Sequence, residues 1–171
     1  MKRLRGYTFV ACAAALALPF AVVPASAGTS STSQLPTQLR SLVNATRAQY
    51  GLSRLHHSAR LDRSALLKAE AIRSCQSFSH TPCGSSFART FQQTGYFRGN
   101  VRIGENLFWG SGGLGTPASA VSAWLKSPPH RANLLGRGWR DVGVGMVYAP
   151  SIFGASNVWI FVLQFGRHSS T

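Results

Sequence analysis

A histidine between two cysteines is the first feature that could carry chemistry. The segment CQSFSHTPCGSS, residues 75–86, places His80 between Cys75 and Cys83, which lie eight positions apart. In an oxidising compartment, two cysteines this close are expected to form a disulfide. The alternative is a zinc site, but that requires CxxC spacing or further thiols, and the segment has neither. A disulfide would order the loop and reduce the entropy lost when His80 captures a ligand.

A second histidine lies at the expected start of a short helix. In SPPHRANLLG, residues 127–136, Ser127 can cap the helix, Pro128 fits the first turn and Gly136 can end it. His130 then lies in the first turn, where exposed backbone N–H groups disfavour a positively charged ring. The neutral imidazole is the form that ligates a metal ion or acts as a base.

One of the four carboxylates in the chain differs from the others in its surroundings. The other three fit a helix start, a solvated helix face and a strand start, and they are Asp62, Glu70 and Asp141 in that order. Glu105 stands between Gly104 and Asn106 in an otherwise apolar segment. A carboxylate there must find hydrogen bonds or a cation. Glu105 is therefore the candidate acid of the site.

His80 and His130 are 50 residues apart, so only the fold can bring them to one site. With Glu105, two neutral imidazoles could bind zinc and leave a position open, as in catalytic His₂Glu sites. The alternative is a hydrogen-bonded polar cluster in which Glu105 orients one histidine and water fills the rest. A third interpretation is a metal-assisted hydrolase in which Glu105 positions or deprotonates a metal-bound water. The remaining histidines are expected to be solvated, and they are His56, His57 and His168.

The N-terminal 27 residues have the pattern of a secretory signal. A short basic stretch precedes an apolar run over residues 7–23, and residues 25–27 form a small-x-small cleavage site. The alternative is an uncleaved N-terminal anchor. We predict a secreted protein with a signal peptide at 1–27, a loose leader at 28–34, one domain at 35–166 and a tail at 167–171.

The charge balance is strongly basic. Loss of Lys2, Arg3 and Arg5 with the signal would leave 15 basic against 4 acidic residues, a net charge of +11. Such a surface favours anionic partners, such as cell-envelope polymers or lipid headgroups. No nucleic-acid-binding motif accompanies the charge, so we expect no specific nucleic acid partner.

Hydrophobic periodicity predicts helices first and strands after and between them. The expected helices cover residues 35–50, 58 or 61 to 74, 86–94 and 118–125, with the short helix before residue 136. In the second helix, the residues expected to point inward are Leu61, Ala65, Leu66, Ala69 and Ile72. Residues 141–148 and 157–165 read as a hairpin, and residues 100–109 as another strand or extended segment. This order predicts an α+β domain or a three-layer α/β/α domain.

Several motifs, in this order, resemble the extracellular CAP superfamily, which includes cysteine-rich secretory proteins and bacterial SCP-like domains. The matching stretches are LVNATRAQYGLSRL from residue 42, FSH from 78, TGY from 94, GENLFWG from 104, WLKSPPHRANLLG from 124 and WIFVLQFG from 159. The resemblance covers nearly all of the chain after the signal. It implies a three-layer α/β/α sandwich with an open central groove.

The resemblance also implies a set of groove residues. His80, Glu105 and His130 match the family's groove histidines and first glutamate, whereas Ser127 stands where other members carry a second glutamate. In some members the histidine pair binds zinc or another divalent ion, which makes His80 and His130 the expected metal ligands. We predict a monomeric, secreted binding module whose groove takes a divalent metal or a small ligand. The alternatives are a metal-assisted hydrolase of a peptide or envelope component, with Glu105 as catalytic residue, and adhesion to anionic envelope polymers through arginines.

Overall fold

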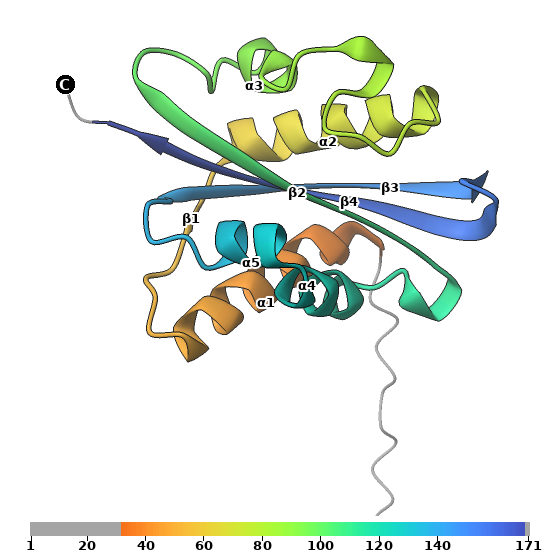
Figure 1. Ribbon diagram of the computed structural model, residues 1–171, viewed down its shortest axis with the longest axis horizontal. Helices are drawn as coiled ribbons and strands as arrows, with labels where there is room; N and C mark the ends of the chain where they lie inside the picture. The colour runs from red at the N-terminus through yellow and green to blue at the C-terminus, as the bar shows by residue number, and fades with distance from the viewer. Residues whose placement is uncertain (1–31, 170–171) are drawn as a thin grey trace, which may run out of the picture.

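The computed structural model describes residues 32–169, and the expected signal at 1–27 lies outside the described residues. A sheet with strand order β1-β3-β4-β2 forms the middle of three layers. Helices α2 and α3 cover one face, and α1, α4 and α5 cover the other (Figure 1). This arrangement confirms the predicted α/β/α sandwich. Within residues 32–169, no helix is long and apolar enough to cross a membrane.

The helices begin and end close to the predicted positions. Their bounds are α1 Leu35–Gln49, α2 Ala59–Ser74, α3 Arg89–Gln93, α4 Pro117–Lys126 and α5 Pro128–Leu134, with 3₁₀ turns η1 Thr32–Gln34, η2 Pro82–Gly84 and η3 Gly112–Leu114. Side chains cap two of them: the Ser58 hydroxyl accepts from Leu61 N–H, and the Thr116 hydroxyl accepts from Ser119 N–H. The third helix is shorter than predicted because the chain up to Ala88 forms turns.

The three predicted strands are longer than expected, and the two-residue strand β1 was not predicted. Their bounds are β1 His56–His57, β2 Val101–Ser111, β3 Asp141–Ile152 and β4 Ala155–His168. β4 is antiparallel to both β3 and β2, and β1 is parallel to β3. The β3–β4 hairpin turns at Phe153 and Gly154, whose φ angles of 55° and 74° are both positive, as in a type I′ turn. Phe-Gly lacks the Asn-Gly or Asp-Gly signature, so the sequence did not indicate so tight a turn.

Two glycines in β3 let α2 lie directly on the sheet. A Cβ atom at Gly143 would lie 2.2 Å from the backbone carbon of Leu61, and one at Gly145 would lie 2.1 Å from that of Ala65. Both distances are too short for any side chain. The helix therefore packs against the strand backbone, which places its C-terminal end and the following loop close to β2 and β4.

We predict that Gly145→Ala lowers the free energy of unfolding by about 3 kcal/mol, at the upper end of the usual range for overpacking. The reason is that neither the helix backbone nor the strand can move away cheaply. Urea denaturation measures the change. Gly113→Ala is the matched control, because a Cβ there meets nothing within 4 Å. Equal stability of the two variants would contradict the close packing.

Candidate functional site

The side chains of His80 and Glu105 are in direct contact. His80 lies in the loop between α2 and η2, and its Nδ1 is 2.8 Å from Oε1 of Glu105 on β2. The other oxygen of Glu105 accepts a hydrogen bond of 2.8 Å from the side-chain amide of Gln164, its cross-strand partner on β4. The Glu105 side chain is fully buried, whereas that of His80 is 47% exposed. A buried carboxylate thus holds a histidine that faces solvent.

This contact fixes the tautomer of His80. An ionised carboxylate can only accept hydrogen bonds, so Nδ1 of His80 carries the hydrogen and donates it to Glu105. Nε2 then keeps its lone pair. Both oxygens of Glu105 are already used, and its side chain has no exposed surface. Glu105 therefore orients the histidine and does not itself face the groove.

Lys68 is a part of the site that the sequence pattern did not reveal. It is fully buried on α2 and donates a hydrogen bond to the backbone carbonyl of His80. Burial lowers the pKa of Lys68, and the charge of Glu105 raises it.

The face of α2 that points inward differs from the prediction at one position. Leu66 was expected on the inner face, but it is 41% exposed, which makes that prediction wrong. Lys68 points inward because it follows Ala65 by three positions, which keeps it on the same helix face.

His130 reaches the site from the opposite layer. Its Nδ1 lies 2.9 Å from the hydroxyl of Ser127, the residue that precedes α5. The Ser127 side chain forms no capping bond, contrary to expectation, because its hydroxyl is used by the imidazole. Burial lowers the pKa of His130, and the positive charge that the His80 ring carries when protonated lowers it further. His130 is thus favoured in its neutral form.

Asparagine side chains hold α5 against the edge strand β2. Asn106 donates to the backbone carbonyl of His130 at 2.9 Å, and Asn133 donates to the side-chain oxygen of Asn106 at 3.0 Å. Asn133 also donates to the backbone carbonyl of Glu105 at 3.1 Å. These bonds join β2 to α5 and fix the position of His130.

The structure brings the three predicted residues to one edge of the sheet, but not into a three-ligand metal site. Within residues 32–169, no group of three or more histidine, cysteine, aspartate or glutamate side chains is placed to hold a metal ion. Both oxygens of Glu105 are engaged, one by His80 and one by Gln164, so the structure does not present Glu105 as a third ligand. Across the described part of the chain, no hydrogen bond joins His130 to His80 or Glu105. The other histidines of the sequence lie apart from this cluster, with His57 against Asp62 and His168 against Tyr96.

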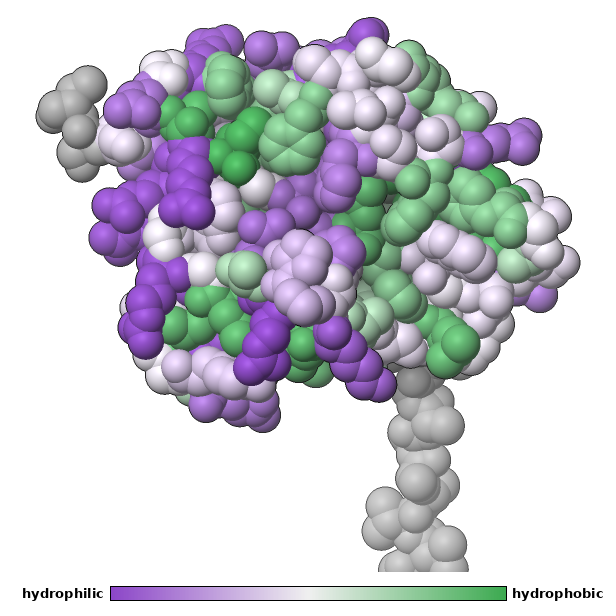
Figure 2. Space-filling model, viewed as in Figure 1, coloured by the Kyte–Doolittle hydropathy of each residue, from purple (hydrophilic) through white to green (hydrophobic). Residues whose placement is uncertain are grey.

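An apolar cavity of about 280 Å³ adjoins His130. It is lined by Ser127 and His130 at one side and by aromatic and aliphatic side chains elsewhere, among them Phe78, Leu107, Trp109 and Trp124. Figure 2 shows a broad group of hydrophobic residues on the right of this face, towards the β3–β4 hairpin and the end of β2, whereas on the left smaller hydrophobic groups lie among hydrophilic residues. The polar cluster thus meets an apolar surface.

A disulfide joins Cys75 and Cys83, as the spacing predicts, with their Cα atoms 5.6 Å apart. Cys75 is the residue that ends α2, and Cys83 lies in η2. The bond closes the loop that carries His80. It therefore attaches this loop to the end of a helix that is itself packed on the sheet.

A family model describes this combination of fold and residues. The model of the CAP family, the cysteine-rich secretory protein family, matches residues 40–165. The chain belongs to the CAP family. The matched range lies inside the folded unit, which extends from α1 to the end of β4 at His168.

Individual proteins resemble this chain in sequence or in fold. The uncharacterised protein YkwD of Bacillus subtilis is 30% identical over 125 residues, which are 72% of this chain and 47% of that protein. An extracellular protein with an SCP domain from Bacillus anthracis matches with a TM-score of 0.64 and 21% identity, over 80% of this chain and 41% of that one. An outer surface protein of Borrelia burgdorferi matches with a TM-score of 0.62 and 22% identity, over 78% and 92%. The chain spans less than half the length of YkwD and of the Bacillus anthracis protein.

We predict that in this CAP domain the pKa of His130 lies below its ordinary value and rises towards it in His80→Ala. Removal of His80 takes away the positive charge that its ring carries when protonated, which is the smaller of the two causes of the shift. NMR titration of the imidazole resonances measures both values. His56→Ala is the control, because His56 lies on β1, and it should leave the titration of His130 unchanged. An identical pKa in wild type and His80→Ala would mean that the two rings do not interact.

Proposed function

We propose that this protein is an exported CAP-domain binding module whose groove holds a divalent metal ion, such as zinc, through Nε2 of His80 and of His130. The observation that carries the proposal is the way both Nδ1 atoms are anchored. Glu105 accepts a hydrogen bond from Nδ1 of His80, and the Ser127 hydroxyl contacts Nδ1 of His130. A histidine that binds a metal through one nitrogen usually bonds a carboxylate or another polar group through the other.

The two-histidine set also supports a binding role over a hydrolytic one. Two protein ligands leave coordination positions on a metal for an exogenous ligand, and a bound metal would polarise that ligand. Hydrolysis would further require a base that reaches a metal-bound water. Glu105 is buried, with both oxygens engaged, so it serves as an anchor for His80 rather than as that base.

The apolar cavity beside His130 indicates what kind of ligand fits. One end of such a ligand would meet the histidines, and an apolar part would enter the space of about 280 Å³ bordered by Phe78 and Trp124. Three observations support export of the protein. The N-terminal sequence has a signal pattern, the chain carries a disulfide, and two structural relatives are described as extracellular or outer surface proteins.

We predict that chelator-treated protein binds zinc in calorimetric titration and that His80→Ala and His130→Ala each abolish or strongly weaken this binding. Glu105→Gln should weaken it by about 10–100-fold, the usual effect of changing the partner of a metal-bound histidine. His56→Ala, an exposed histidine on β1, is the matched control and should bind like wild type. Unchanged zinc affinity in both groove variants would refute the metal site.

The same preparation tests for turnover. We expect the zinc-loaded protein to leave casein and purified cell wall intact. Turnover that disappears in Glu105→Gln would instead support a metal-assisted hydrolase. Binding to anionic envelope polymers that collapses with salt, and that Glu105→Gln leaves unchanged, would show adhesion through the arginines instead of the groove.

We further predict that Cys75→Ser/Cys83→Ser lowers the free energy of unfolding by about 2.5 kcal/mol, the value for a loop of this length. The free energy of zinc binding should become less favourable by a larger amount. Without the bond, the loop of His80 must be ordered during binding. Calorimetry gives the first quantity and urea denaturation the second. Unchanged affinity for zinc in the variant would show that other contacts alone, such as those of Lys68, order the loop.

A further inference from the structure

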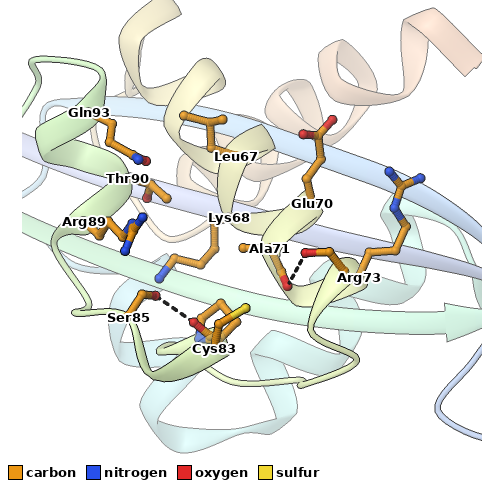
Figure 3. Close-up of a pocket in the computed structure, with 12 residues that line it drawn as sticks. Leu67, Lys68, Glu70, Ala71, Arg73, Cys83, Ser85, Arg89, Thr90 and Gln93 are labelled. Carbon is orange, nitrogen blue, oxygen red and sulfur yellow. Dashed lines mark hydrogen bonds between the residues drawn. The ribbon is translucent and has the colours of Figure 1, made fainter.

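A second cavity, of about 440 Å³, lies on the α2 side of the sheet. It is bounded by α2, the disulfide loop and α3 (Figure 3). None of the groove residues His80, Glu105 and His130 lines it. Its volume lies within the range of about 300–1,000 Å³ that is usual for small-molecule sites. The cavity is therefore large enough to be a separate binding site.

The charges around this cavity are mainly positive. Lys68, Arg73 and Arg89 line it, against the single carboxylate of Glu70. Figure 3 shows Lys68 extending towards the part of the cavity where Arg89 and Ser85 lie, whereas Glu70 extends away from them. Across residues 32–169, neither Lys68 nor Arg89 takes part in an ion pair. The cavity is therefore lined by more positive than negative side chains, although the charge of Glu105 also attracts Lys68.

Lys68 places a buried positive charge beside this cavity. Its ammonium group donates to the backbone carbonyl of His80 and lies over the ring of Phe87, and the charge of Glu105 attracts it. The side chain is fully buried, so it would act on an anion in the cavity through its charge and not through direct contact. Charge attraction in such surroundings is stronger than in water.

The rest of the cavity wall is apolar or carries hydroxyl groups. Leu67, Ala71 and Pro82 contribute carbon surface, and Ser85 and Thr90 contribute hydroxyls. Such a wall suits a molecule with a charged end and a short apolar body, and not a bare inorganic ion.

We propose that this cavity binds a small organic anion, with its carboxylate or phosphate group held by Arg89 near the buried charge of Lys68 and its apolar body against Leu67, Ala71 and Pro82. This site is distinct from the histidine groove and does not depend on metal binding there. Lys68 contacts both, because the same ammonium group holds the backbone of His80.

The test is calorimetric titration at constant ionic strength with hexanoate and with hexyl phosphate, which together show which headgroup is preferred. Wild type should bind at least one of them more tightly than it binds acetate or inorganic phosphate, because the apolar body adds contact area. Arg89→Ala should weaken that binding by about tenfold or more, the loss expected for a hydrogen bond to a charged group. Arg63→Ala, an exposed arginine on α2 outside the cavity, removes the same charge and should have little effect.

A second variant tests the space instead of the charge. Ala71→Phe keeps every cation but fills part of the cavity, so it should block binding while circular dichroism shows an intact fold. His80→Ala should leave anion binding intact, because Lys68 bonds the backbone of that residue and not its side chain. Absence of binding by wild type, or equal losses in Arg63→Ala and Arg89→Ala, would overturn the proposal.

Discussion

The groove depends on one buried carboxylate. Glu105 is an acid in a layer of apolar strands, and its burial is tolerated only because each oxygen receives a hydrogen bond, from His80 and from Gln164. The positive charge of Lys68 nearby compensates the acid further, while Lys68 holds the His80 backbone. The hydrogen bond from His80 to Glu105 thus stabilises the buried carboxylate and, at the same time, attaches the loop of His80 to the sheet. Loss of this contact would leave a buried charge unpaired.

The Gly-Glu-Asn sequence of β2 joins all three layers because neighbouring residues of a strand face opposite ways. Glu105 faces the α2 layer and meets His80. Asn106 faces the other layer and donates to the backbone of His130. Gly104 faces the same way as Asn106, and a Cβ atom there would lie 2.7 Å from the ring of Trp139. Glu105 and Asn106 therefore set the positions of the two histidines, one from each side of the sheet edge.

The fold, the disulfide and the candidate residues His80, Glu105 and His130 could be predicted from the sequence, because each is marked by a local sequence pattern. Glu105 was an acid in an apolar segment, and the cysteines flanked His80 at short spacing. Lys68 and Gln164 carried no such sign. A lysine on a helix reads as solvated, and a glutamine in a strand reads as facing outward. Their roles follow from strand register, which pairs Glu105 with Gln164, and from the approach of α2 to the glycines of β3. Register and close approach are properties of the whole fold, which local periodicity does not encode.

The serine at position 127 explains how the two histidines differ. A carboxylate next to His130 would stabilise its protonated form, whereas the hydroxyl of Ser127 contacts Nδ1 without adding negative charge. Burial and the charge of His80 then lower the pKa of His130, so the neutral ring prevails. A neutral ring with one nitrogen anchored leaves the other free to accept a metal or a donor group. The departure from the two-glutamate pattern thus leaves one acid for His80 and none for His130, which suits the ligand site that we propose.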